Sequence, residues 1–221
     1  VIPIQNVASV EAERPGSIGI IALLMSDSEN PIDFVVVPKD STIKSPRELR
    51  GKTVVVFPGT FAETLTRLAL DKLGVQDVKF VKLPPGEMAQ ALQTGQAHAG
   101  VVYEPVASLA EHQGWGRVIE RGLWEKNLIS PLVIGAYAYN GPVARSNPVL
   151  AGRAWDALAR AIADSKANPL QARRPLLRYL KVPDEILPKL PSPRVEMADT
   201  IDHTLLRRTV GFYAQNGILA K

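Results

Sequence analysis

Cysteine is absent from the 221 residues. Its absence excludes disulfide bonds, catalytic thiolates and zinc sites built on cysteine. No run of 18 or more apolar residues occurs, so the sequence predicts no transmembrane helix. The three histidines, His98, His112 and His203, stand apart without the spacing of metal ligands. We therefore expect no metal site in the protein.

Motifs of common enzyme classes are missing as well. The sequence contains no G-x-S-x-G nucleophile elbow, no G-x-x-x-x-G-K-[ST] phosphate loop and no G-x-G-x-x-G dinucleotide turn. Gly16-Ser17-Ile18-Gly19 is followed by a strand pattern, whereas a dinucleotide turn must lead into a helix. These absences predict a protein that is not an enzyme and that holds no cofactor.

Charge of one sign is not in large excess. Lysine and arginine together number 26 against 22 aspartate and glutamate residues, which gives a net charge of +4 at pH 7. The basic residues are scattered along the chain, whereas nucleic-acid binding needs them gathered on one face. The charge balance argues against a nucleic-acid partner and provides a weak long-range attraction for anions.

Short apolar runs alternate with amphipathic segments over the first 140 residues. The runs have the length of buried strands, and the segments between them carry apolar residues at helical spacing. This alternation predicts an α/β fold with a mostly parallel sheet and helices on both faces. The predicted strands span 1–4, 18–25, 32–37, 53–57, 78–83, 99–103, 117–120 and 132–139.

The C-terminal part of the chain is expected to be helical. Asn147-Pro148 and Asn168-Pro169 each have the form of a helix start, and Pro175 should interrupt the second helix. A third helix is predicted from Arg194 to Asn216. The segment 183–193 contains four prolines and is expected to be a rigid surface connection.

Two stretches of the sequence resemble the nitrate/sulfonate/taurine group of periplasmic solute-binding proteins. The first is 40–60, DSTIKSPRELRGKTVVVFPGT, and the second is 83–105, LPPGEMAQALQTGQAHAGVVYEP. The resemblance covers about 34–217 and is more specific for fold and transport class than for ligand. The chain departs from the group at His98, where aspartate is usual, and at Tyr103, where tryptophan is common.

This resemblance implies a type 2 periplasmic-binding-protein fold with two lobes, each a mostly parallel sheet flanked by helices. Residues 1–40 plus 131–221 would form lobe I and residues 41–130 lobe II. Members of the group carry a strand-helix-strand-helix segment ahead of the residues that match Val1, so lobe I is expected to be incomplete at its N-terminal side. The segments 38–42 and 130–139 would be the crossovers between the lobes.

The function implied by the resemblance is capture of a small organic anion or zwitterion, sulfonate-, taurine-, nitrate- or pyrimidine-like, through closure of the lobes. The protein would be a periplasmic or lipid-anchored monomer that delivers its ligand to an ABC transporter permease. Two alternatives remain open at this point. Effector domains of LysR-type regulators share the architecture, and so does a thiamine-pyrimidine synthase, although that enzyme uses a cysteine-rich motif.

Candidate ligand-binding residues follow two neighbouring predicted strands. Gly59, Thr60 and Phe61 link the strand at 53–57 to a helix, where free backbone N–H groups attract anions. An alternative is a capping box between Thr60 and Glu63. Tyr103 could be a rigid ligand platform or a core residue, and Glu104 could accept a hydrogen bond from the ligand or cap its own helix.

Two further sets of candidates lie outside this region. Gln5 and Asn6 are predicted to end the first strand, where their amides could contact a ligand, although Asn6 could instead be a helix cap. Tyr137 is predicted to face the ligand from the strand at 132–139. Tyr139 lies two residues further on and has the same orientation along a strand, so the choice between the two tyrosines stays open.

Overall fold

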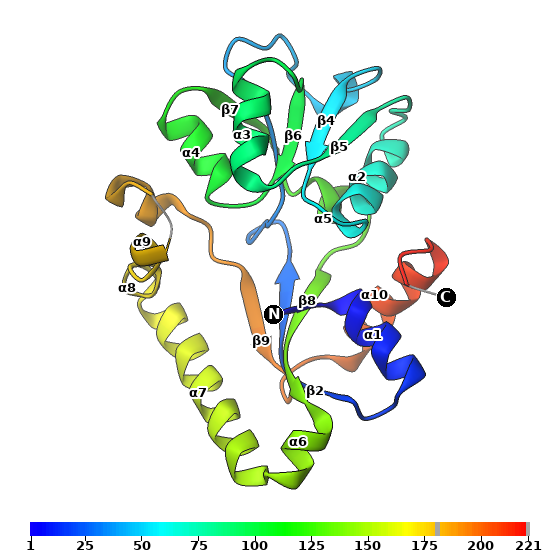
Figure 1. Ribbon diagram of the computed structural model, residues 1–221, viewed down its shortest axis with the longest axis vertical. Helices are drawn as coiled ribbons and strands as arrows, with labels where there is room; N and C mark the ends of the chain where they lie inside the picture. Colours follow the sequence, from blue (N-terminus) through cyan, green and yellow to red (C-terminus); the bar gives the residue numbers. More distant parts are fainter. Residues whose placement is uncertain (180–181, 220–221) are drawn as a thin grey trace. The chain divides into compact units, whose positions relative to one another are not determined.

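The computed structural model describes residues 1–179 and 182–219. The chain divides into two compact units. Unit 1 contains Val1–Ser26, Pro131–Pro175 and Ser192–Lys221, and unit 2 contains Asp27–Ser130 and Leu176–Pro191. Each unit has one sheet, and helices pack on both sheets (Figure 1). The predicted α/β class is confirmed.

Unit 2 is built on a five-stranded sheet in the order β5-β4-β6-β3-β7. The central strand pairs, β4 with β5 and β4 with β6, are parallel, and β3 runs antiparallel to both β6 and β7. Short crossovers through helices connect the parallel strands, as the alternating sequence pattern predicts. The strands are β3 (Phe34–Pro38), β4 (Thr53–Val56), β5 (Lys79–Lys82), β6 (Ala99–Val102) and β7 (Gly116–Arg121).

Helices of unit 2 bury the apolar side chains of this sheet. Met88 and Leu92 of α3 and Ala107 of α4 pack with Phe34 and Val102 in one core. Helices α2 and α5 contact each other. The short helix η1 starts at Ser45-Pro46, where the serine side chain accepts from the N–H of Arg47. The helices are η1 (Pro46–Glu48), α2 (Phe61–Lys72), α3 (Pro85–Gln93), α4 (Val106–His112) and α5 (Leu123–Asn127).

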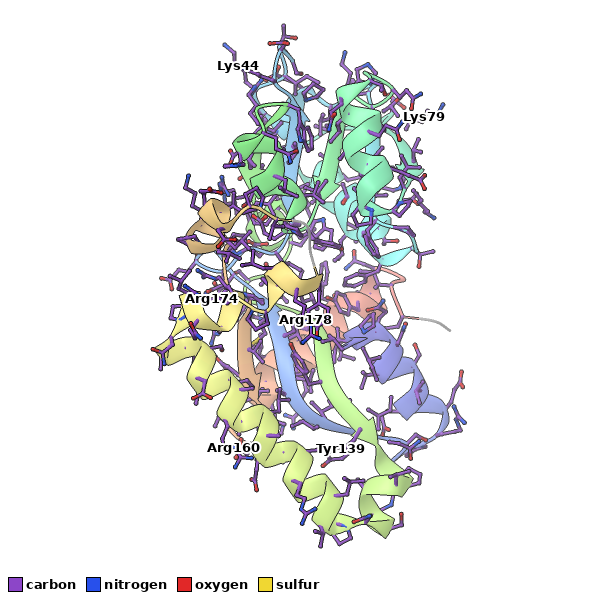
Figure 2. All side chains as sticks on the ribbon, turned by 60° about the vertical axis from the view of Figure 1, so that its left-hand side comes forward. Lys44, Lys79, Tyr139, Arg160, Arg174 and Arg178 are labelled. Atoms are coloured by element: carbon purple, nitrogen blue, oxygen red, sulfur yellow. The ribbon has the colours of Figure 1, made fainter. Side chains whose placement is uncertain are left out.

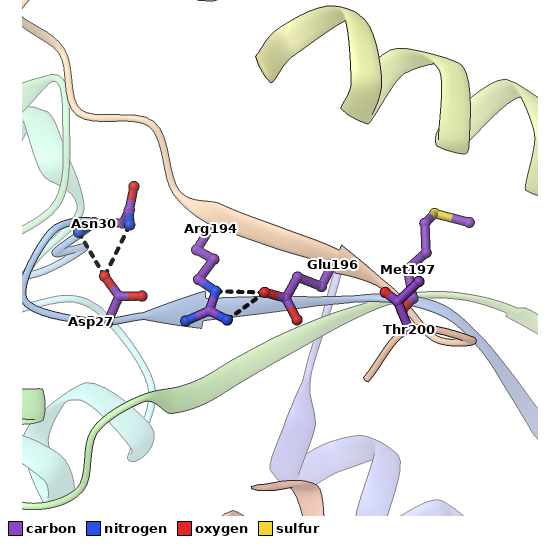
Figure 3. A network of polar contacts seen from close by, with 6 residues as sticks. All are labelled: Asp27, Asn30, Arg194, Glu196, Met197 and Thr200. Atoms are coloured by element: carbon purple, nitrogen blue, oxygen red, sulfur yellow. Dashed lines mark hydrogen bonds and ion pairs between the residues drawn. The ribbon is translucent and has the colours of Figure 1, made fainter. Parts of the chain in front are cut away.

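The lobe boundary predicted at residue 40 is wrong for the segment 27–40. This segment opens with a turn in which Asp27 Oδ1 accepts hydrogen bonds from the backbone and side-chain N–H groups of Asn30, each at 2.9 Å (Figure 3). The segment then forms β3, whose residues 34–37 are fully buried between β6 and β7. Because a strand buried on both faces belongs with the sheet that covers it, 27–40 is part of unit 2.

The proline-rich segment also differs from its prediction. Within 183–193 the chain forms a 3₁₀ helix, η2 (Asp184–Lys189), and Ile186, Leu187 and Leu190 are buried. These side chains and Val182 pack against Leu109 of α4. Ile186, Leu187 and Leu190 recur at a spacing of about one helical turn, so a short helix places all three side chains on the face that packs against Leu109. Its neighbour in this unit is α9 (Leu176–Tyr179).

Unit 1 has a four-stranded sheet in the order β1-β8-β2-β9, and all its strand pairs are antiparallel. A mostly parallel sheet is therefore found in unit 2 alone. The physical reason lies in the chain path, because the chain leaves unit 1 after β2 at Ser26 and returns at Pro131 to run back along β2 as β8. The strands are β1 (Ile2–Pro3), β2 (Ile18–Ser26), β8 (Leu132–Asn140) and β9 (Arg194–Met197).

Strand β9 corrects the helix predicted from Arg194. Arg194 and Glu196 lie two residues apart on one face of the strand, where Arg194 Nε donates to Glu196 Oε1 at 2.7 Å (Figure 3). This ion pair fits the two-residue period of a strand. The helix α10 (His203–Gln215) starts later, where the Asp202 side chain accepts from the N–H of Thr204 at 2.8 Å.

Helices of unit 1 follow the predicted starts at Asn147 and Asn168. Asn147 accepts from the N–H of Leu150 at 3.0 Å, and the second helix breaks before Pro175 as expected. Helices α1 and α10 pack against β8, where the buried Tyr213 hydroxyl donates to the Val133 carbonyl at 2.7 Å. No helix of the described residues is long and apolar enough to cross a membrane. The remaining helices are α1 (Ile4–Glu13), α6 (Gly141–Ser146), α7 (Pro148–Ala167) and α8 (Pro169–Arg173).

Candidate functional site

Five of the predicted ligand residues meet at one edge of the unit 2 sheet. Strands β4 and β6 are parallel neighbours, with Val56 opposite Val101. The segments that follow them, 57–61 and 103–104, therefore leave the sheet at the same edge. Gly59, Thr60 and Phe61 are thus brought together with Tyr103 and Glu104, as the sequence predicts.

Four aromatic rings form a continuous series at this edge. The Tyr103 ring lies 5.6 Å from the Phe57 ring and 5.9 Å from the Trp124 ring, and Trp124 lies 6.1 Å from Phe61. Trp124 is fully buried, and its indole N–H donates to Thr66 Oγ1 at 3.0 Å. Edge-to-face packing on a fixed indole holds the Tyr103 ring in place and gives this edge a rigid aromatic surface.

Glu104 lies two residues before α4 and is partly buried. Its carboxylate accepts hydrogen bonds from the backbone N–H of Ser108 at 3.1 Å and from the Ser108 hydroxyl at 3.0 Å. Burial raises the pKa of Glu104, and these two hydrogen bonds oppose the rise. The predicted capping of its own helix is confirmed. A carboxylate has about four acceptor positions, so this one retains acceptor capacity for a ligand donor.

The capping box predicted at the start of α2 is wrong. Thr60 already has helical backbone angles, φ −93° and ψ −25°, and its side chain makes no capping hydrogen bond. Glu63 instead forms ion pairs with Arg67 at 2.8 Å and with Lys82 at 2.9 Å, and these cations lower its pKa. The cause is the pairing of β4 with β5, which brings Lys82 next to Val56. Because Arg67 and Lys82 balance its charge, Glu63 repels an anion at this helix end less than an unpaired Glu63 in a capping box would.

A buried pair of carboxyl groups, Asp33 and Glu125, was missed by the sequence analysis. Asp33 is 0% exposed and Glu125 4% exposed. Asp33 Oδ2 accepts from the N–H of Leu123 at 2.9 Å. Burial, and then the neighbouring Glu125 carboxylate, raise the pKa of Asp33, while the N–H groups of Trp124 and Leu123 oppose the rise. The two carboxyl groups are close neighbours in the interior, so ionising both of them there is costly.

This pair is connected to the aromatic series, since Asp33 accepts from the N–H of Leu123, the residue before Trp124. Burial raises the pKa of Tyr103, and the charge of Asp33 raises it further, so the Tyr103 phenol stays protonated and can donate a hydrogen bond. A signal was present in the sequence. Asp33 interrupts the apolar run 32–37, and a charged residue within a buried strand requires a partner.

The remaining predicted residues lie in unit 1. Gln5 and Asn6 do not end a strand, because α1 starts at Ile4 directly after Pro3, whose fixed φ of −55° suits a helix start. Asn6 is exposed, and Gln5 Oε1 is buried without a hydrogen-bond partner among the described residues. Asn6 is therefore not a helix cap either.

Tyr137 and Tyr139 are half-buried on β8, opposite Ala22 and Gly19. The Tyr139 ring covers the backbone of Gly19 so closely that a β-carbon there would lie 2.0 Å from the ring (Figure 2 labels Tyr139). Tyr139 thus has a packing role on β2. The role of Tyr137 in ligand binding stays a prediction.

Two α/β units, one of them with an aromatic and carboxylate surface at the carboxyl ends of parallel strands, match the fold of periplasmic binding proteins. Solved structures support this class. The periplasmic aliphatic sulphonate binding protein SsuA of Escherichia coli matches with a TM-score of 0.72 at 19% identity, over 96% of this chain and 72% of that one. The alkanesulfonate-binding protein SsuA of Xanthomonas axonopodis pv. citri, solved with bound MOPS, matches with a TM-score of 0.73 at 16% identity, over 96% and 73%.

The chain belongs to the NMT1/THI5-like family, whose sequence model matches residues 20–172. Among curated proteins, a binding protein of Brucella abortus is 28% identical over 143 residues, which are 63% of this chain and 44% of that protein. An aliphatic sulfonates-binding protein of Escherichia coli is 29% identical over 92 residues, 41% of this chain and 29% of that protein. The matches therefore span less than half the length of these relatives.

The same fold also occurs in an enzyme. The desulfurization enzyme DSZB matches with a TM-score of 0.66 at 19% identity, over 99% of this chain and 78% of that one. Fold likeness alone thus does not separate binding from catalysis. Within residues 1–179 and 182–219, no group of three or more histidine, aspartate or glutamate side chains is arranged to hold a metal ion.

Proposed function

We propose that the protein is the solute-binding component of an ABC uptake system and that it captures its ligand without altering it. The observation that supports this most directly is the rigid aromatic edge of unit 2, where Phe57, Tyr103 and Glu104 combine stacking surface with hydrogen-bonding groups. Small-molecule sites are commonly apolar surfaces with few, well-placed polar groups.

The proposed ligand is a small organic anion or zwitterion of the sulfonate, taurine, nitrate or pyrimidine kind. The sulfonate-binding relatives favour this class, and so does the net charge of +4. The N-terminus of helix α2 presents the positive end of the helix dipole to an anionic group. The negative charge of Glu63 beside it is balanced by Arg67 and Lys82. Glu104 and the Tyr103 hydroxyl would bind polar groups elsewhere on the ligand.

We further propose that units 1 and 2 act as the two lobes, that Gln5, Asn6 and Tyr137 contribute contacts from unit 1, and that the protein works as a monomer. The location would be the periplasm or the outer face of the cytoplasmic membrane, where a permease accepts the loaded protein. The family membership and the ABC-type structural neighbours support this placement.

Thermal unfolding with a panel of alkanesulfonates, taurine, nitrate, carboxylates and pyrimidines tests the proposal. At a hundredfold excess over Kd, a true ligand adds about 2.7 kcal/mol of stability, and the midpoint rises by roughly 5–10 °C. Tyr103→Ala should reduce this shift strongly, whereas Tyr179→Ala, at a site 76% exposed, should leave it unchanged. The proposal fails if no compound gives a saturable shift or if Tyr103→Ala binds like the wild type.

Conversion of the ligand is the second candidate, favoured by the match to the desulfurization enzyme over almost the whole chain. It is separated from capture by mass spectrometry of the ligand after long incubation with the protein. Capture returns the compound unchanged in stoichiometric amount, whereas an enzyme returns a product that accumulates over many turnovers.

A further inference from the structure

A groove of about 470 Å³ lies between α3 and α4 of unit 2. Helix α3 follows β5 and α4 follows β6, and both strands are parallel to β4. The two helices therefore start at the same edge of the sheet and run in the same direction. The groove between them leads from the aromatic edge described above toward the opposite edge, over roughly 10–12 Å of helix.

The lining of the groove changes along its length. Most of the lining is apolar, and this apolar section includes Met88 and Ala89 of α3, Val106 and Leu109 of α4, and Val182. Polar groups occur at the two ends. Glu104 stands at the aromatic edge, and the amides Gln93 and Gln113 stand where α3 and α4 end, with Gln113 accepting from the Trp115 indole N–H at 3.0 Å.

The charge of the lining restricts what the groove can hold. Among the described residues that line it, Glu104 has the only charged side chain, and no lysine or arginine is present. An anionic group inside the groove would lose hydration without a cation to replace it, which is costly. An uncharged hydrocarbon group would instead be favoured by burial against the apolar section.

The groove is continuous with the proposed ligand site, which indicates what occupies it. Phe57, Tyr103 and Glu104 belong both to the aromatic edge and to the lining of the groove. We infer that the captured solute has an uncharged alkyl or arylalkyl chain and that this chain lies in the α3–α4 groove, while the polar head stays at the strand ends. This inference rests on the proposed function, because it assigns part of the same solute to a second region of unit 2.

Chain-length series of ligands provide the test. Affinities of n-alkanesulfonates from ethane- to decanesulfonate, and of neutral n-alcohols of the same lengths, are measured by calorimetry below their aggregation concentrations. Each methylene that enters the groove should strengthen binding about fourfold. The gain should end at roughly eight to ten carbons, where an extended chain reaches the glutamine end.

Substitutions on α3 separate the groove from non-specific binding. Ala89→Phe places a ring in the groove and should abolish the increase in affinity with chain length. Ala89→Leu adds a smaller side chain, so the increase should end at a shorter chain than in the wild type. Gln90→Phe adds the same ring at the next, exposed position, which does not line the groove, and should keep the wild-type slope. Circular dichroism spectra establish that each variant is folded.

The outcomes distinguish this inference from the proposed function. Sulfonates that bind equally at all lengths overturn the inference and leave solute capture standing. Alcohols that show the slope while no sulfonate binds support the apolar groove and count against anion capture. A slope that survives Ala89→Phe, or a dimer in sedimentation that Ala89→Phe disrupts, overturns the inference, because the chain or a second copy would then occupy the surface differently.

Discussion

At the scale of single residues, the Asp33–Glu125 pair is the most demanding arrangement in unit 2. Two neighbouring carboxyl groups are removed from water, and Asp33 also accepts a hydrogen bond from the backbone at the start of α5. Burying one carboxylate without a cation is costly, and burying two next to each other costs more. Protonation of one of the two groups therefore lowers the cost of the arrangement that holds the start of α5, and with it Trp124, in place.

We expect this pair to make stability depend on pH. The pKa of Asp33 is raised in the folded protein, so its contribution is complete below the pKa of an unfolded aspartate, about 4, and is lost as pH rises through the raised value. Glu125→Gln removes one of the two acidic groups and with it the charge that raises the pKa of Asp33. Relative to wild type, the variant should gain about 1 kcal/mol or more between pH 5 and pH 9, as measured by urea unfolding.

A matched substitution provides the control for this prediction. Glu120→Gln changes the same chemical group on β7, where Glu120 pairs with Lys126 and is partly exposed. Its effect should stay within about 0.5 kcal/mol at each pH. Equal pH slopes for wild type and Glu125→Gln would show that the two carboxyl groups do not affect each other's ionisation in this range.

Residue-level features were predictable from the sequence where local spacing decides them. The positions of Tyr103 and Glu104 follow from a buried strand that leads into a helix, and the sequence places them correctly. The Asp33–Glu125 contact joins residues 92 positions apart, which no local pattern reveals. The supposed capping box failed for the same reason, because Lys82 reaches Glu63 through strand pairing rather than through sequence proximity.

At the scale of elements, strands and helices were predicted well in unit 2 and less well in unit 1. Apolar runs specify that a strand is buried, but not which sheet buries it, so β3 was assigned to the wrong lobe. The short strand β9 was absorbed into a predicted helix because RVEM lacks a strong strand pattern. Pairing with β2, across almost 170 residues, decides its conformation.

Glycine at the junction of β8 and α6 gives a prediction at this scale. The Gly141 N–H donates to the Ser17 carbonyl at 2.8 Å, and a β-carbon on Gly141 would lie 2.1 Å from the backbone oxygen of Gly16. The turn at 16–17 must then move, and we expect Gly141→Ala to lower the free energy of unfolding by about 1–3 kcal/mol. Chemical denaturation measures this loss.

Another glycine offers a control of opposite sign. Gly152 lies within α7 with open space around it and no strained backbone angle. Replacing it with alanine in a helix interior should raise the free energy of unfolding by about 0.5–1 kcal/mol. A gain in stability from both alanine substitutions would contradict the close backbone contact at Gly141, since helix propensity alone would then account for both effects.

At the scale of the whole molecule, neither unit is made from one continuous piece of chain. Unit 2 consists of Asp27–Ser130 and Leu176–Pro191, and the second piece covers Leu109 with Val182, Ile186 and Leu187. The two pieces are joined by residues 131–175, which belong to unit 1. When unit 1 unfolds, this connection becomes a flexible loop of about 45 residues, whose closure costs roughly 3 kcal/mol.

A substitution that destabilises unit 1 should therefore also lower the free energy of unfolding of unit 2. Tyr213→Phe removes the hydroxyl that donates to the Val133 carbonyl inside unit 1, and it should cost about 1–3 kcal/mol. In a Trp155→Phe background the remaining indoles, Trp115 and Trp124, report on unit 2 alone. Their fluorescence in urea should shift to a lower midpoint together with the circular dichroism signal, whereas Tyr179→Phe, at an exposed ring, should shift neither. A fluorescence midpoint that stays in place while the dichroism midpoint falls would mean that unit 2 folds independently of the chain that joins its pieces.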